Sequence, residues 1–127
     1  MTQFRYFVVY KPYGMLSQFS AEGAHRTLAD LPYVFPKDVY PVGRLDADSE
    51  GLLLLTNDNR LKTRLLDPKA KHWRTYWVQV EGQVTAKACQ QLVEGATSSI
   101  NSKKHTTLPA RVELLPEPQL PERNPPI

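Results

Sequence analysis

One segment of this 127-residue chain concentrates the residue types that could carry chemistry: residues 43–58, which read GRLDADSEGLLLLTND. Asp46, Asp48 and Glu50 lie between Arg44 and a run of four leucines. Acidic side chains at alternate positions could bind a cation, or one of them could act as a catalytic carboxylate. The neighbouring residues distinguish these two hypotheses.

A calcium-binding loop of the EF-hand type fits this segment only in part. Such a loop begins with alternating oxygen ligands, turns at a glycine and closes on a bidentate glutamate at its last position. Counted from Asp46, the early positions are suitable, but the last position is Asn57, which cannot bind as a bidentate carboxylate. Pro41 and Gly43 also make the preceding segment a poor helix. The pattern therefore disfavours a calcium site.

A catalytic carboxylate explains the neighbours better. If residues 43–46 are extended, Arg44 and Asp46 point to one face and Leu45 points inward, because side chains alternate along an extended chain. A guanidinium beside Asp46 would favour its ionised form and could also reach a phosphate. The four leucines would form a rigid support. A purely structural Arg–Asp pair at the end of a strand is the alternative.

The elements that must position this segment are short and of both kinds. Strands are predicted for residues 4–10, 51–56, 74–82 and 106–115, and helices for residues 26–31, 58–66 and 85–94. The apolar run at 51–56 lacks polar alternation, which predicts a strand covered on both faces. We expect an α+β fold with a mixed, mainly antiparallel sheet and short helices. The proline-rich residues 116–127 are predicted to form a linker.

Composition limits the class of protein. The length allows one domain with a modest core, and the 41% apolar residues are typical of a globular protein. Cys89 is the only cysteine, so no disulfide can form within the chain. The sequence contains no apolar run long enough to span a membrane and does not begin like a signal peptide. We expect no membrane partner and a cytoplasmic location.

The positive charge of the chain is concentrated in residues 60–74, here called the basic segment. Its basic residues are Arg60, Lys62, Arg64, Lys69, Lys71 and Arg74. Asp67 alone opposes them, and the aromatic residues Trp73, Tyr76 and Trp77 lie within or just after the segment. Clustered cations attract phosphates and aromatic faces stack on bases, so this composition favours a nucleic-acid partner. A solvated helix face beside core aromatics is the alternative.

The long segment GRLDADSEGLLLLTND resembles the catalytic motif of the RsuA/RluE-type pseudouridine synthases. VVYKPYGMLSQFS is similar to the N-terminal KP-x-G loop of that family, and RTYWVQVEG resembles its second motif. LPERNPPI is similar to the linker of the branch that modifies large-subunit ribosomal RNA. The resemblance covers essentially the whole chain, and the first motif is the most specific.

The resemblance implies isomerisation of a uridine in large-subunit ribosomal RNA, with no cofactor and no metal. It implies that Asp46 acts on the ribose as nucleophile or base, and that Tyr76 packs on the extruded uracil and takes the C5 proton. It implies that Arg44 either occupies the vacated space in the RNA helix or positions the flipped nucleotide. The base must be flipped because its target atom is inaccessible in a stacked strand. The phosphate contacts implied in addition to Arg44 are Lys11, Arg60, Lys62, Lys69, Lys71 and Arg74.

Family members continue into a third motif that this sequence lacks. Residues 1–115 are therefore expected to form the N-terminal part of a pseudouridine synthase catalytic domain, with 116–127 as a linker toward a missing part. We expect the chain to be inactive alone and to self-associate through an open sheet edge. The alternative function is a non-catalytic RNA-binding module of the same fold. The target uridine is not encoded in a short motif.

Overall fold

A computed structural model describes residues 3–126, which form two compact units. The first unit comprises residues 3–74 together with 122–126, and the second comprises residues 75–121. The predicted division between a domain at 1–115 and a linker at 116–127 stays a prediction. Part of the expected linker packs in the first unit, where the Arg123 guanidinium lies 4.1 Å from the centre of the Tyr13 ring.

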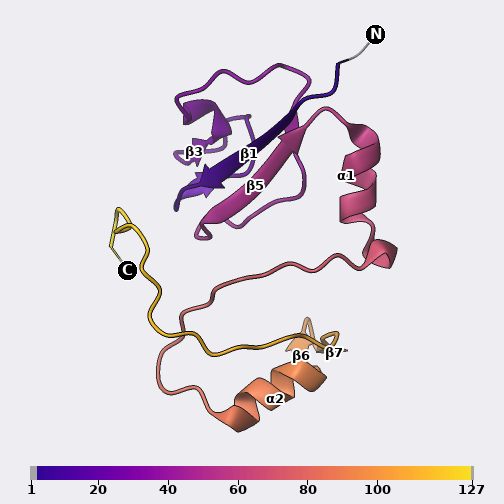
Figure 1. Ribbon diagram of the computed structural model, residues 1–127, viewed down its shortest axis with the longest axis vertical. Coiled ribbons are helices and arrows are strands. Elements are labelled where there is room, and N and C mark those ends of the chain that lie inside the picture. Colours follow the sequence, from indigo (N-terminus) through magenta and orange to yellow (C-terminus); the bar gives the residue numbers. More distant parts are fainter. Residues whose placement is uncertain (1–2, 127) are drawn as a thin grey trace. The chain divides into compact units, whose positions relative to one another are not determined.

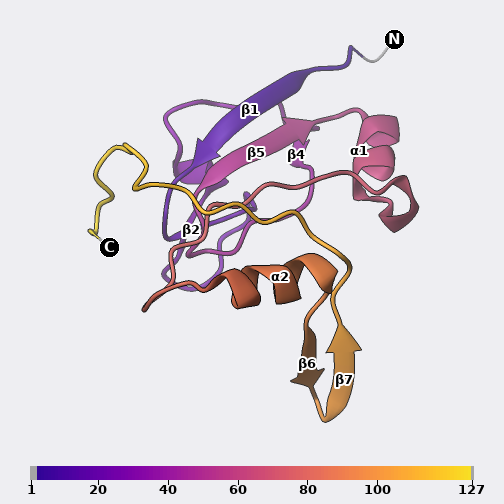
Figure 2. The same ribbon diagram turned by 60° about the horizontal axis from the view of Figure 1, so that its bottom comes forward.

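The first unit is built on a three-stranded antiparallel sheet in the order β1-β5-β4, of which Figure 1 shows β1 and β5 side by side and Figure 2 shows all three strands. The strands are β1 (Tyr6–Lys11), β5 (Gly51–Thr56) and β4 (Tyr40–Pro41). The register of β1 and β5 runs from Tyr6 opposite Thr56 to Lys11 opposite Gly51. This confirms two of the predicted strands and the mainly antiparallel pairing.

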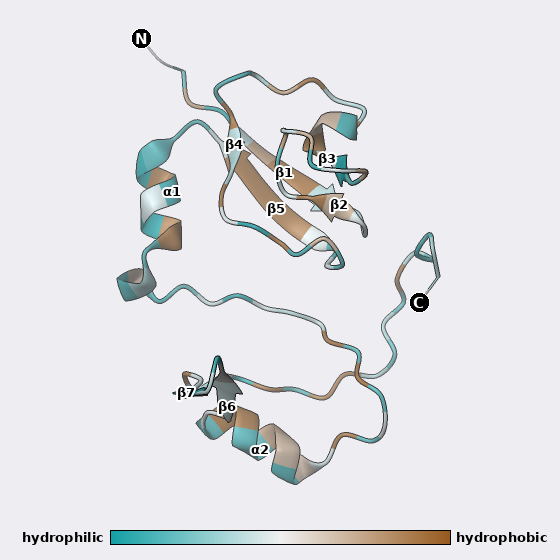
Figure 3. Cartoon of the chain, turned by 180° about the vertical axis from the view of Figure 1, so that it is seen from behind, coloured by the Kyte–Doolittle hydropathy of each residue, from teal (hydrophilic) through white to brown (hydrophobic). Residues whose placement is uncertain are grey.

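Within the described residues of the first unit, the core residues cover one face of this sheet. Leu53 and Leu55 point to the covered face and form the core with Met15, Leu28 and Val39. On the other face, Val8 is 67% exposed and Leu52 is 73% exposed. Apolar colour accordingly runs along both long strands in Figure 3. The prediction that residues 51–56 are covered on both faces is wrong, because the core residues that meet the sheet do so from one side.

The segment between β1 and β4 supplies the side chains that pack on the covered face of the sheet. Within it, β2 (Met15–Leu16) pairs in parallel with β3 (Arg26–Thr27), and the short 3-10 helix η1 (Leu28–Asp30) follows. Thr27 caps η1 in a capping box with Asp30. The helix predicted for residues 26–31 is thus one turn, and Pro32 follows soon after its end.

The helix predicted for residues 58–66 is confirmed as α1 (Asn59–Leu66). Asp58 caps it, with Oδ1 accepting from the Leu61 N–H at 3.1 Å. The Tyr6 hydroxyl donates to Asp58 Oδ2 at 2.6 Å and ties the helix start to β1. This hydrogen bond lowers the pKa of the Asp58 carboxyl and raises the pKa of Tyr6. The chain turns at Asp67 into the 3-10 helix η2 (Pro68–Ala70).

The second unit contains α2 (Ala86–Glu94) and a hairpin of β6 (Thr97–Ile100) and β7 (Lys103–Thr106), visible beside α2 in Figure 2. Helix α2 confirms the predicted helix. The strands predicted for residues 74–82 and 106–115 are wrong. Residues 74–80 form no helix or strand and are exposed, and the observed strand β7 ends at Thr106, before Pro109.

Candidate active site

The segment that carries Asp46 is fixed to the loop after β1. The Gly14 N–H donates to the Ala47 carbonyl at 2.7 Å. The Ser17 hydroxyl donates to the Leu45 carbonyl and accepts from the Leu45 N–H, both at 3.0 Å. Because Ser17 is itself buried, these hydrogen bonds are shielded from water. The two loops therefore form one structural feature, the loop pair (residues 12–18 and 43–47).

The side chains of residues 44–46 alternate between solvent and the interior, as the sequence predicted. Arg44 and Asp46 are exposed, while Leu45 is partly buried. Gly43 has a φ of 75°, and a Cβ built there would lie 3.3 Å from Leu66 Cδ2 at the end of α1. A glycine is needed at this position because the backbone is left-handed and the helix end packs against it.

The expected Arg44–Asp46 pair is not formed. The Arg44 guanidinium donates instead through Nη2 to Gln18 Oε1, at 2.7 Å. Among residues 3–126, the Asp46 carboxylate has no hydrogen-bond or ion-pair partner. The site thus presents an exposed carboxylate and an oriented guanidinium on a fixed backbone, two residues apart in the sequence and not paired with each other.

Lys11 does not lie on the surface. Its side chain is 0% exposed, and its ammonium donates to the carbonyls of Met15 (2.8 Å), Pro12 (3.0 Å) and Ala47 (3.4 Å). Burial lowers the pKa of Lys11, and the nearby carboxylates, chiefly those of Glu50 and Asp48, partly oppose this. The prediction that Lys11 contacts an RNA phosphate is therefore wrong for this structure. The ammonium instead donates hydrogen bonds to backbone carbonyls of both loops of the loop pair.

The predicted basic contacts belong to the first unit, as Asp46 does. Lys62 is partly buried, with Nζ 5.4 Å from the centre of the Tyr40 ring, and Arg74 donates to the Leu65 carbonyl at 3.3 Å. The predicted contacts that are exposed, in addition to Arg44, are Arg60, Lys69, Lys71 and Arg74. Their exposure leaves these cations accessible to a polyanion, and their contact with RNA stays a prediction.

Tyr76 belongs to the second unit and is 63% exposed, in a segment that forms no helix or strand. Its proximity to Asp46 therefore stays a prediction. Two residues that hold the site were missed in the sequence, Ser17 and Gln18. The only sequence signal for them was their place in the quoted loop VVYKPYGMLSQFS, directly after the apolar Met15–Leu16.

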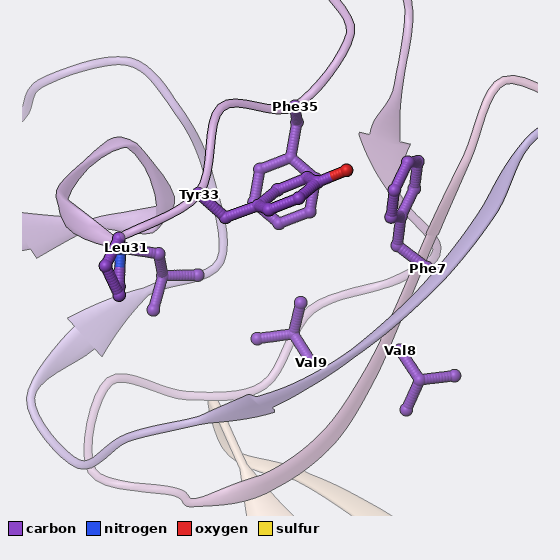
Figure 4. A pocket seen from close by; sticks show the side chains of 7 residues that line it. Phe7, Val8, Val9, Leu31, Tyr33 and Phe35 are labelled. Atoms are coloured by element: carbon purple, nitrogen blue, oxygen red, sulfur yellow. The ribbon is translucent and has the colours of Figure 1, made fainter.

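In the described part of the chain, no group of three or more His, Cys, Asp or Glu side chains could hold a metal ion. An open apolar pocket of about 390 Å³ lies beside β1 (Figure 4), and none of the predicted site residues lines it. Its walls are Phe7, Val8, Val9, Leu31, Pro32, Tyr33 and Phe35. No helix in residues 3–126 has the length and apolar character to cross a membrane.

Known proteins resemble this chain both in sequence and in fold. A model of the family described as RNA pseudouridylate synthase matches residues 5–116. The chain is 50% identical over 117 residues to the ribosomal large subunit pseudouridine synthase E of Vibrio vulnificus, and 51% identical over 120 residues to that of Xanthomonas axonopodis. It is 36% identical over 110 residues to the ribosomal large subunit pseudouridine synthase B of Bacillus subtilis.

The chain spans about half the length of these relatives. The alignments cover 92% of this chain but 47% of the Vibrio protein and 60% of the Xanthomonas protein, and for the Bacillus protein 87% and 43%. A crystal structure of a pseudouridylate synthase matches with a TM-score of 0.71 at 25% identity, covering 91% of this chain and 49% of that one. The α+β fold expected from the sequence is confirmed by this likeness.

Proposed function

Because the chain belongs to the RNA pseudouridylate synthase family, as its motifs predicted, we propose that it carries the catalytic aspartate of an enzyme that isomerises a uridine of large-subunit ribosomal RNA to pseudouridine. In this reaction the N-glycosidic bond to uracil breaks, the base rotates, and C5 is joined to the same sugar carbon. The names of the Vibrio and Xanthomonas relatives support large-subunit ribosomal RNA as the substrate.

The observation that carries the proposal is the state of Asp46. Its carboxylate is exposed and unpaired among the described residues, yet its backbone is held by the hydrogen bonds of Ala47 and Leu45 to the neighbouring loop. A sugar carbon becomes electron-poor as its base leaves, and a fixed carboxylate is the expected partner for it. A mobile or salt-bridged aspartate would have to be reorganised before it could act.

Arg44 and Tyr76 are proposed to handle the base. A uridine must leave the stack to be reached, and the exposed Arg44 guanidinium beside Asp46 in sequence can contact its phosphate or fill the vacated space. Tyr76 offers a flat face for stacking on uracil and a phenol oxygen that can accept the C5 proton. The exposed residues of the basic segment would bind neighbouring phosphates.

The experiment uses a chimera in which this chain replaces the matching region of the Vibrio vulnificus enzyme. The substrate is large-subunit ribosomal RNA tritiated at C5 of uridine, which releases tritium only when C5 is rejoined to the sugar. The chimera should release tritium, and Asp46→Asn should abolish release while RNA binding persists. Asp48→Asn is the matched control and should retain most of the activity. Release by Asp46→Asn comparable to that of the control would refute the assignment.

The same assay separates the alternative function. A chimera that binds the RNA but releases no tritium, while the intact Vibrio enzyme does, would favour a non-catalytic RNA-binding module. The 127-residue chain should be assayed alongside, and we expect it to release no tritium by itself.

A further inference from the structure

Gln18 uses both ends of its side-chain amide. Its Oε1 accepts from Arg44 Nη2 at 2.7 Å. Its Nε2 lies within hydrogen-bond distance of the Ser20 carbonyl (3.0 Å), the Ser20 hydroxyl (3.3 Å) and Glu22 Oε2 (3.3 Å). Reversing the amide would set its NH2 group against the guanidinium, with donors facing donors. The amide orientation in which Oε1 accepts from Arg44 is therefore the one in which both ends of the amide form hydrogen bonds.

The backbone around Gln18 is fixed as well. The Gln18 carbonyl accepts from the Leu28 N–H at 2.8 Å, and Leu28 is 0% exposed in the core. On the other side, Ser17 exchanges two hydrogen bonds with Leu45, the residue after Arg44. The acceptor oxygen is thus held in a defined place relative to the backbone from which the Arg44 side chain starts.

We propose that Gln18 is a positioning residue that holds the Arg44 guanidinium in one orientation for the phosphate backbone of the RNA. The proposal rests on the proposed function for its ligand. A guanidinium has five N–H donors, so one bond to Gln18 leaves donors for a phosphate. An amide is a neutral acceptor, so it orients Arg44 without cancelling the positive charge that attracts the RNA. A carboxylate partner such as Asp46 would cancel it.

The expected effect follows from the ordering of one long side chain. A free arginine loses rotamer freedom when it binds, and this loss for one side chain corresponds to roughly 2- to 10-fold in affinity. Gln18 removes that loss in advance because it orders Arg44 before the RNA arrives. The entropy cost of ordering the Arg44 side chain arises when the RNA binds and not in the chemical step. Loss of Gln18 should therefore raise Kd and KM and leave kcat unchanged.

The first test examines the free 127-residue chain and requires no RNA. Nitrogen-15 relaxation of the Arg44 Nε–H group should show restricted motion in the wild type and greater motion in Gln18→Met, which has similar length but no acceptor. Gln90→Met is the matched control, because Gln90 also donates to a glutamate, Glu94, at 3.0 Å on a different unit. Unchanged Arg44 relaxation in Gln18→Met would overturn the proposal.

The second test is a double-mutant cycle in the chimera described above. Gln18→Met should raise the Kd and KM for large-subunit ribosomal RNA by roughly 2- to 10-fold in the wild-type background and have no effect in an Arg44→Met background. Equal weakening in both backgrounds would mean a purely structural role, and a change confined to kcat would also overturn the proposal. If no variant releases tritium, the proposed function fails, while the Kd cycle and the relaxation experiment still decide whether Gln18 acts through Arg44.

Discussion

The buried Lys11 ammonium makes the sharpest prediction about stability. Lys11→Met keeps a straight side chain of similar length but removes the donor to the carbonyls of Pro12, Met15 and Ala47. The Ala47 carbonyl keeps its hydrogen bond from the Gly14 N–H. The substitution therefore chiefly affects the Pro12 and Met15 carbonyls. The contact with the Met15 carbonyl is the shortest of the three, at 2.8 Å.

The magnitude can be worked from these two carbonyls. A buried acceptor that loses its partner costs roughly 1–3 kcal/mol, and the part-buried Pro12 carbonyl should cost less than the buried Met15 carbonyl, so the two together would cost roughly 2–4 kcal/mol. Part of this is offset, because the wild type must bury an ammonium and the methionine does not. We expect Lys11→Met to lower the free energy of unfolding of the first unit by about 2 kcal/mol, the lower end of that range. Lys37→Met, at an exposed position, should change it by less than about 0.5 kcal/mol.

The effect should also depend on pH. The pKa of Lys11 is lowered by burial below its ordinary value of 10.5, so the unfolded chain binds more protons than the folded chain between those two pKa values. Stability of the wild type should therefore rise with pH as pH approaches 10.5, and the deficit of Lys11→Met should grow. Urea unfolding followed through the methyl NMR signals of Leu53 and Leu55 would report on the first unit alone. A variant as stable as wild type, or a deficit that shrinks with rising pH, would refute the reasoning.

Four further predictions concern RNA, acid and association. Neutralising Lys69, Lys71 and Arg74 together should weaken RNA binding and lower the slope of log K against log salt by roughly 0.7–0.9 for each lost phosphate contact; an unchanged slope would place them away from the RNA. In the chimera, Tyr76→Phe should slow tritium release with little change in Kd, whereas a weakened Kd at unchanged rate would contradict proton transfer. The Tyr6 hydrogen bond lowers the pKa of Asp58 below 3.8, so wild type should lose stability as pH falls below 3.8 and Asp58→Asn should lose less, as acid unfolding would show. The apolar open face and edge of the first sheet should cause concentration-dependent association, and light scattering that reports a monomer at all concentrations would exclude it.

The elements that the sequence predicted well are those with strong local signals. Helices α1 and α2 each begin at a capping side chain, Asp58 and Thr85, and β1 carries an uninterrupted β-rich run. Residues 74–82 have an equally strong local preference for a strand but do not form one here. A strand is defined by the neighbour that accepts its backbone hydrogen bonds, and that neighbour is not encoded in the segment itself.

The candidate site shows the same division between local and distant information. Alternation predicted that Asp46 is exposed and Leu45 turned inward, but it offered Asp46 as the partner of Arg44. The actual acceptor, Gln18, lies 26 residues earlier in the chain and meets Arg44 only because the two loops are brought together by the fold. For Lys11 a local signal existed: Lys11 follows Phe7 and Val9 at alternate positions of β1, and all three side chains turn to the covered face.

The buried lysine also explains the acidic cluster next to Asp46. The carboxylates of Glu50, Asp48 and, to a smaller extent, Asp46 favour the charged form of Lys11 and so compensate for its burial. The Lys11 ammonium is thus a positive charge within the protein that interacts with these three carboxylates, so they do not require a bound metal cation for charge balance. We therefore expect Asp48 and Glu50 to contribute to stability through Lys11. Asp46 has the smallest effect of the three carboxylates on Lys11, which agrees with our proposal that it acts on the sugar instead.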